Sequence, residues 1–371
     1  MFKRIILFFI VISLFLECAY ALAPSAKSAI LIDAKSGKVL YEKNAYEKLS
    51  MASTTKIMTA ICAIENGKVD DVVKVDSKAV GTEGSSMYLG YGESITLKNL
   101  LYGLMLSSGN DAAVAIAIHI SGDEKSFVKL MNDTAKRIGA INTSFETPNG
   151  LDGKNHYTTA YDLALITKYA LSNPFFREIV KTDSIKIGNG EKTRYLTNHN
   201  KLLRIYEGAT GVKTGFTKKS GRCLVSSAKR NDIEVVAVTL NAPNDWNDHK
   251  SMLDFAFDNY ENANIIKTGD YAISINVDDS DIKSVGLEFL GDISVLKNKN
   301  DTLDYIIKYD IPKSIKAPVL FGQHIGTAHV ISNGKEIGTV KLVSKNSIDK
   351  KQTKNLKDEF TKLIIKYIQG V

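Results

Sequence analysis

The spacing of apolar residues predicts strands at both ends of the first 260 residues and helices between them. From residue 29, AILIDAKSGKVLYE has two apolar runs around a Ser-Gly turn, which predicts a hairpin. Strands are expected again at 223–229 and 233–241. Helices are expected at 53–65, 96–121 (interrupted by the polar residues 107–111), 125–138, 158–171 and 247–260. The pattern therefore predicts an α/β domain whose single sheet is assembled from both ends, with a helical region inserted between them.

After about residue 264 the pattern changes to short, β-rich segments separated by turns. Examples are YAISINV, GLEFLG, YIIKYDI, IGTAHVIS and IGTVKLVS. This texture is typical of a small all-β domain, which we place at residues 264–345 after an α/β domain at 22–263.

Residues 346–371 read as a polar linker followed by an amphipathic helix. One stripe of that helix carries Leu356, Phe360, Leu363, Ile364, Tyr367 and Ile368. The helix could dock on the protein's own surface or lie in a membrane interface. The lysines outside the stripe and the polar lead-in KNSIDKKQTK favour the membrane surface as its partner.

The first 21 residues have the features of a signal peptide. Lys3 and Arg4 precede an apolar run at 5–16, and Ala19-Tyr20-Ala21 offers small residues for cleavage after Ala21. Twelve apolar residues are too few for a membrane span. The residues that flank Cys18 disfavour a lipoprotein signal. We therefore expect export and action at the outer face of the cytoplasmic membrane.

Composition and charge exclude several classes of protein. Of the 371 residues, 44% are hydrophobic and 24% charged, which excludes a disordered chain or a disulfide scaffold. The net charge of +7 is spread along the chain, so nucleic acid is not an expected partner. The six histidines are scattered, and no metal or other cofactor is predicted. Export leaves Cys62 and Cys223, which we interpret as buried free thiols because both lie in apolar stretches.

The first candidate chemistry lies in Ser53-Thr54-Thr55-Lys56. A serine at the start of a helix is normally an N-cap, but that role does not explain a lysine where a capping box has Glu or Gln. The i to i+3 spacing sets the amine beside the hydroxyl. Burial near the positive end of the helix dipole would favour the neutral amine, which can take the serine proton. This motif alone is weak evidence, because Ser-x-x-Lys occurs seven times, including at Ser126 and Ser226.

A second polar triplet interrupts an apolar helical stretch at Ser108-Gly109-Asn110. It could simply break the helix, with Asn110 or Asp111 capping the next segment. Alternatively, the Ser108 hydroxyl relays a proton to a leaving amine, and the Asn110 amide orients the lysine and the substrate backbone.

The third motif, Lys213-Thr214-Gly215, lies in GATGVKTGFTKKSG just before two apolar strands. A glycine in a strand lets a peptide approach closely, and Lys213 with Thr214 can bind a carboxylate. A second triplet, Lys267-Thr268-Gly269, lacks both the glycine-rich lead-in and the paired strands, so we do not assign it to the site.

In this order the three motifs resemble those of the penicillin-interacting serine enzymes. More narrowly, the chain resembles the low-molecular-mass penicillin-binding proteins, which are serine-type D-alanyl-D-alanine carboxypeptidases. The resemblance covers about residues 28–345 and includes LLYGLMLSSGNDAAVAIA and NPFFREIV. It implies an α/β catalytic domain of the penicillin-binding-protein and β-lactamase type, a helical subdomain, a small all-β domain and a C-terminal amphipathic helix.

The resemblance also implies roles. Ser53 would be the acylated nucleophile, Lys56 its base, and Ser108 and Asn110 the opposite wall. Lys213 and Thr214 would hold the substrate carboxylate, and Asn110 and Gly215 would also bind the substrate. The backbone N–H groups of Ser53 and Phe216 would form the oxyanion hole. Many relatives have histidine in place of Phe216, which concerns side-chain specificity and not the main-chain donor. The implied substrate is the pentapeptide stem of peptidoglycan, with β-lactams as inhibitors.

Three other activities share these motifs. A D,D-endopeptidase would act on cross-links through the same residues. A class A β-lactamase would need an aspartate in place of Ser108 and a glutamate deacylation base, for which Glu146 is a candidate by position only. A penicillin-binding protein with an idle site would bind without turnover.

Overall fold

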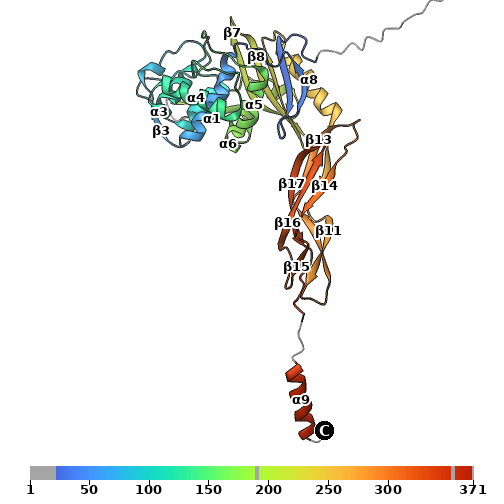
Figure 1. Cartoon of the computed structure of the whole chain (residues 1–371). Helices are drawn as coiled ribbons and strands as arrows, with labels where there is room; N and C mark the ends of the chain where they lie inside the picture. Colours follow the sequence, from blue (N-terminus) through green and yellow to red (C-terminus); the bar gives the residue numbers. More distant parts are fainter. Residues whose placement is uncertain (1–21, 189–191, 352–355, 370–371) are drawn as a thin grey trace, which may run out of the picture. The chain divides into compact units, whose positions relative to one another are not determined.

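The structure is a computed structural model that describes residues 22–188, 192–351 and 356–369. The expected signal peptide at 1–21 lies outside these residues. The chain divides into two compact units, Met1–Asp258 and Asn259–Val371, which are described separately (Figure 1).

Unit 1 is built on a five-stranded antiparallel sheet in the order β2-β1-β9-β8-β7. Its strands come from both ends of the unit, as the sequence pattern predicted. The expected N-terminal hairpin is β1–β2. Strand β8 extends the segment predicted at 223–229 at both ends, and β9 ends one residue before the segment predicted at 233–241. The strands are β1 (Ser28–Asp33), β2 (Val39–Lys43), β7 (Ala209–Thr217), β8 (Gly221–Arg230) and β9 (Ile233–Leu240).

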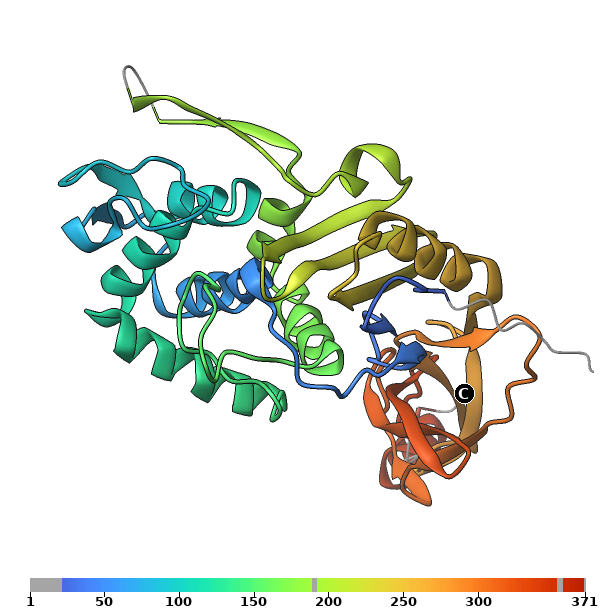
Figure 2. The ribbon, with the colours of Figure 1, turned by 90° about the horizontal axis from the view of Figure 1, so that it is seen from above.

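Helices fill the segment between these strands. The stretch predicted at 96–121 is two helices, which end and begin around Ser107–Gly109. The helices are α1 (Lys56–Asn66), α2 (Leu97–Leu106), α3 (Asn110–Ser121), α4 (Glu124–Ile138), α5 (Ala160–Leu171), α6 (Pro174–Lys181), α7 (Leu202–Ile205) and α8 (Asp245–Asn259). Helices α5 and α8 cover opposite faces of the sheet (Figures 1 and 2). Apolar residues from α1 to α6 and from the sheet form one buried core.

Two small antiparallel strand pairs stand outside the main sheet and were not predicted. One pairs β3 (Val72–Lys74) with β4 (Ser94–Thr96), and the other pairs β5 (Ser184–Ile187) with β6 (Arg194–Thr197). Their strands have only three or four residues, too few for a periodic signal. Figure 2 shows the β5–β6 hairpin extending from the helical region.

Two sequence features turn out to have structural explanations. Ser226, which begins one of the other Ser-x-x-Lys matches, is buried and lies 2.6 Å from His249 Nδ1. The other ring nitrogen of His249 lies 2.9 Å from Thr239 Oγ1, so the imidazole joins β8 and β9 to α8. Cys62 and Cys223 are buried free thiols, as predicted.

Unit 2 is mostly β-structure. Its six-stranded sheet has the order β14-β16-β17-β12-β11-β15, and β10 pairs separately with β13. The sequence pattern predicted five of these strands and missed β10, β13 and β15. The strands are β10 (Tyr260–Ile266), β11 (Tyr271–Asp278), β12 (Ser284–Leu290), β13 (Ile293–Asn298), β14 (Ile306–Asp310), β15 (Ser314–Lys316), β16 (His324–Ser332) and β17 (Lys335–Ser344).

The last described element is helix α9 (Leu356–Ile368), where the amphipathic pattern predicted a helix. Its apolar side chains Phe360, Leu363, Ile364, Tyr367 and Ile368 are exposed. Within the described residues, no helix has the length and hydrophobicity needed to cross a membrane.

Candidate active site

Ser53 and Lys56 meet at the start of α1. Ser53 lies in a 3-10 turn, Ala52–Thr55, that leads into the helix, and its side chain makes no capping hydrogen bond there. Lys56 is the first residue of α1, and its Nζ lies 2.9 Å from Ser53 Oγ. The same nitrogen lies 2.6 Å from Asn110 Oδ1 and 2.6 Å from the Asn149 carbonyl oxygen. The amine is therefore surrounded by one hydroxyl and two acceptors.

The second predicted triplet forms the junction between α2 and α3. Ser108 lies in the break, and Asn110 begins α3. The Asn110 side-chain amide donates to the Glu83 carbonyl, and its backbone N–H donates to the Ser85 carbonyl at 2.7 Å. These contacts determine which end of the Asn110 amide faces Lys56, so its oxygen points at the amine.

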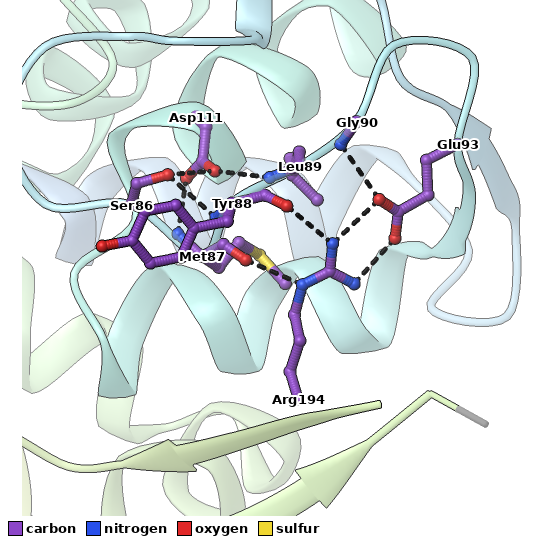
Figure 3. Close-up of polar contacts among 8 residues, drawn as sticks. All are labelled: Ser86, Met87, Tyr88, Leu89, Gly90, Glu93, Asp111 and Arg194. Atoms are coloured by element: carbon purple, nitrogen blue, oxygen red, sulfur yellow. Dashed lines mark hydrogen bonds and ion pairs between the residues drawn. The ribbon is translucent and has the colours of Figure 1, made fainter. Parts of the chain in front are cut away.

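Residues 83–93 form a loop beside this triplet that the sequence patterns did not single out. Asp111 is not the N-cap of α3, although its carboxylate accepts the Ala112 N–H in the first turn at 2.9 Å. The same carboxylate accepts from Ser86 Oγ at 2.6 Å and from the N–H groups of Met87 and Leu89 at 3.0 Å (Figure 3). On the other side, Arg194 of β6 pairs with both Glu93 oxygens at 2.7 and 2.8 Å.

Arg194 also donates to the backbone of the same loop. Its Nε donates to the Met87 carbonyl at 2.7 Å, and Nη2 donates to the Tyr88 carbonyl at 2.9 Å (Figure 3). The Glu93 side chain is almost fully buried, so this bidentate pair is shielded from water. The loop that contacts Asn110 is thus held from two sides.

The third predicted triplet lies on the edge strand β7. Lys213 is buried, and its Nζ donates to the Thr214 carbonyl at 3.0 Å. A Cβ at Gly215 would lie 3.1 Å from the backbone nitrogen of Ser53, so glycine lets β7 pack closely against the 3-10 turn. Gly215 thereby brings the backbone of the third triplet against that of the first.

These segments enclose a cavity of about 320 Å³ in unit 1. Ser53, Ser108, Thr214, Gly215 and Phe216 all line it, whereas Lys56, Asn110 and Lys213 lie behind its surface. The sequence patterns did not indicate the other lining residues, which are Ser85, His199, Lys201, Arg222, Asp245 and Trp246.

The sequence patterns also did not indicate a loop that supplies a backbone carbonyl to Lys56. In residues 145–156, the Asn149 carbonyl reaches Lys56, and a Cβ at Gly150 would lie only 2.1 Å from the Ala52 carbonyl oxygen. His156 Nδ1 accepts the Glu146 N–H at 3.0 Å, which leaves Nε2 as the donor to Thr55 Oγ1 at 2.8 Å. A contact made by a backbone carbonyl gives no signal in the amino-acid sequence, because every residue has one.

Among the described residues, those with positive φ that are neither Gly, Asn nor Asp all lie at this site. Ala52, Tyr88 and Ser108 all have positive φ, at 47°, 60° and 58°, although none is glycine. Such conformations cost roughly 1 to 3 kcal/mol each and persist only where surrounding contacts impose them. Each of these residues belongs to, or directly adjoins, a segment that forms the cavity.

Burial changes the basicity of both lysines. Loss of hydration lowers the pKa of Lys56 well below its ordinary value, and the nearby Lys213 lowers it further, while Asp111 acts in the opposite direction. Burial alone lowers the pKa of Lys213 to about 7. Burial and the neighbouring Lys213 therefore favour the neutral amine of Lys56 over its charged form.

The sequence profile of the family described as D-alanyl-D-alanine carboxypeptidase matches residues 18–244. The chain belongs to this family. A second profile, the C-terminal domain of penicillin-binding protein 5, matches residues 260–350. The D-alanyl-D-alanine carboxypeptidase DacF of Bacillus subtilis is 37% identical over an alignment of 339 residues that covers 89% of this chain and 87% of DacF.

Other carboxypeptidase relatives support the same assignment. DacC of Escherichia coli, also a D-alanyl-D-alanine carboxypeptidase, is 33% identical over 350 residues, covering 88% of this chain and 86% of DacC. The crystal structure of penicillin-binding protein 5 from Haemophilus influenzae superposes with a TM-score of 0.67 at 28% identity, covering 88% of this chain and 98% of that one. The predicted fold class and serine hydrolase assignment are confirmed.

Proposed function

We propose that this member of the family is a D-alanyl-D-alanine carboxypeptidase that removes the terminal D-Ala from peptidoglycan pentapeptide stems. Ser53 attacks the carbonyl of the penultimate D-Ala, the terminal D-Ala leaves as an amine, and water hydrolyses the acyl-Ser53 ester. The observation that carries this proposal is the position of the Lys56 amine, 2.9 Å from Ser53 Oγ and in contact with two acceptors.

A count of hydrogens explains why these contacts suit a base. A neutral amine has two hydrogens and one lone pair. The Asn110 amide oxygen and the Asn149 carbonyl oxygen can only accept, so they take the two hydrogens. The lone pair of Lys56 then faces the Ser53 hydroxyl and can accept its proton during attack. The lowered pKa of Lys56 keeps the amine available in this form.

The remaining predicted residues suit the rest of the reaction. The N–H groups of Ser53 and Phe216 would bind the oxyanion, where a preorganised donor contributes roughly 3 to 4 kcal/mol. The Thr214 hydroxyl would bind the terminal carboxylate, with the Lys213 charge behind it. Ser108, in the cavity wall, would relay the proton from Lys56 to the leaving amine, which balances the proton taken from Ser53.

The other activities have less support at this site. Ser108 stands where a class A β-lactamase would have aspartate, and Glu146 does not line the cavity. Glu146 instead accepts a hydrogen bond from the backbone N–H of Asn155 at 2.9 Å. A D,D-endopeptidase would use the same groups, so the substrate decides between the two.

Product analysis of the mature chain tests the proposed activity. With a pentapeptide stem we expect one equivalent of D-Ala and a tetrapeptide, and cross-linked stem dimers should be cleaved much more slowly. Ser53→Ala should release nothing above background. Faster cleavage of dimers would replace the proposal with an endopeptidase, and binding of penicillin without product release would indicate an idle site.

We also propose that residues 1–21 direct export and that α9 associates with the outer surface of the cytoplasmic membrane. The exposed apolar side chains of α9, together with Lys362 and Lys366, support an interfacial location. The mature chain should sediment with anionic lipid vesicles, and a chain ending at residue 351 should not. Equal sedimentation of both chains would contradict this role of α9.

A further inference from the structure

The cavity that holds the catalytic serine is also lined by a group of side chains that the reaction leaves unused. Arg222 lies on β8, directly across from Phe216 of β7 in the strand register. Asp245 and Trp246 begin helix α8 and line the same cavity. We call Phe216, Arg222, Asp245 and Trp246 the Arg222 subsite.

The guanidinium of Arg222 is held in a defined orientation. Its Nε and Nη2 lie 3.0 and 2.9 Å from the same oxygen of Asp245, whose side chain is buried. The guanidinium carbon also lies 5.5 Å from the centre of the Trp246 indole ring. These contacts occupy the Nε–Nη2 edge of the guanidinium. Across the described parts of the chain, Nη1 makes no hydrogen bond, and the Arg222 side chain is 40% exposed.

The direction of β7 indicates which part of a stem peptide reaches this subsite. This step rests on the proposed function. If Thr214 binds the terminal carboxylate and the N–H of Phe216 binds the scissile carbonyl, the peptide runs antiparallel to β7. The residue before the penultimate D-Ala then lies beyond Phe216, at the hairpin end of the strand, where Arg222 is located.

The third residue of a peptidoglycan stem is a diamino acid, and its side chain ends either with a carboxylate beside the amine or with the amine alone. Among the residues that line the cavity, Lys201 and Arg222 carry positive charge and Asp245 alone is acidic. Asp245 already pairs with Arg222 through the Nε–Nη2 edge of the guanidinium. The Nη1–Nη2 edge therefore offers N–H donors in the geometry that suits a carboxylate. The ammonium of a lysine at the third stem position would instead face the positive charge of Arg222.

We propose that Arg222 is a specificity-determining residue that binds the side-chain carboxylate of the third stem residue. The subsite then favours stems with meso-diaminopimelate over stems with lysine. Asp245 and Trp246 are positioning residues that orient the guanidinium, and the exposed ring of Phe216 offers an apolar surface for the methylenes of the side chain.

The only tryptophan of the chain lies in this subsite, so its fluorescence reports binding directly. In a Ser53→Ala background, which prevents turnover, a meso-diaminopimelate pentapeptide should change Trp246 emission at concentrations about tenfold or more below those needed for the lysine pentapeptide. In the active chain, kcat/KM should favour the former by about ten- to a hundredfold.

Arg222→Gln should remove this preference by lowering kcat/KM for the diaminopimelate stem alone, and Arg222→Lys should restore it in part. Arg222→Gln also leaves the buried Asp245 carboxylate without its charge partner. The double variant Arg222→Gln, Asp245→Asn avoids this unpaired charge and should lose the preference for the diaminopimelate stem in the same way. Arg230→Gln is the matched control, because Arg230 lies on the same strand and stacks on Tyr206 at 4.6 Å, outside the cavity.

Two results would overturn the inference: equal kcat/KM for the two stems in the parent chain, or an equal loss on both stems in Arg222→Gln. A short N-acylated D-Ala-D-Ala peptide without a third side chain separates failure of the Arg222 subsite from failure of the proposed carboxypeptidase activity. If that peptide is hydrolysed but the preference is absent, only the Arg222 subsite fails. If it is not hydrolysed, the proposed function fails as well.

Discussion

Lys56→Gln is expected to be acylated by a β-lactam about a thousandfold more slowly than the parent chain. Glutamine keeps an N–H donor for the acceptors on Asn110 and Asn149, but its amide nitrogen has no basic lone pair. Removing a general base costs roughly 10²- to 10⁴-fold in rate, and the two acceptors that aim the Lys56 lone pair at Ser53 place the effect within that range. Stopped-flow acylation with a chromogenic cephalosporin measures the rate.

Another Ser-x-x-Lys match supplies the control for this prediction. Ser126 and Lys129 have the same spacing, but Lys129 is exposed and pairs with Asp133 at 2.6 Å on the surface of α4. The Lys129→Gln variant should be acylated by the β-lactam at the same rate as the parent chain. Thermal unfolding of both variants shows whether the fold is kept. A folded Lys56→Gln chain that acylates as fast as the parent would remove Lys56 from the mechanism.

Gly150→Ala is expected to slow acylation about a hundredfold, although Gly150 contributes no side chain to the site. Its φ of +89° disfavours alanine, and the new Cβ would lie 2.1 Å from the Ala52 carbonyl oxygen. The loop must move, which withdraws the Asn149 carbonyl from Lys56 and disturbs the turn that carries Ser53. A displacement of about 1 Å at a reacting group can cost about a hundredfold in rate.

Gly139→Ala separates the contact from the backbone strain. Gly139 has a similar φ of +93° at the end of α4, but a Cβ there would meet nothing within 4 Å. Both variants should lose about 1 to 3 kcal/mol of stability from the left-handed conformation. Only Gly150→Ala should lose acylation rate, and equal rates in the two variants would mean that the loop carbonyl does not position Lys56.

The sequence predicted the parts of this protein that repeat a pattern over many residues. Strands β1, β2, β8 and β9 and the long helices have clear apolar periodicity, so both the sheet and the helical insertion could be inferred. The three motifs could be selected from many chance matches only because they occur together and in order. Short elements such as β5 and β6 gave no periodic signal.

The groups that hold the site in place could not be inferred, for physical reasons. The Asn149 contact to Lys56 is made by a backbone carbonyl, which any residue possesses. The pairing of Arg194 with Glu93 joins residues 101 positions apart, and neither belongs to a motif. The positive φ of Ala52 and Ser108 is imposed by tertiary contacts, because neither residue favours it intrinsically.

Peptide mass spectrometry of the mature chain after incubation with a β-lactam tests the role of Ser53 most directly. We predict a single covalent adduct on the peptide that contains Ser53, and none in Ser53→Ala. An adduct that persists in Ser53→Ala, or that maps to Ser126 or Ser226, would contradict the assignment of Ser53 as the nucleophile.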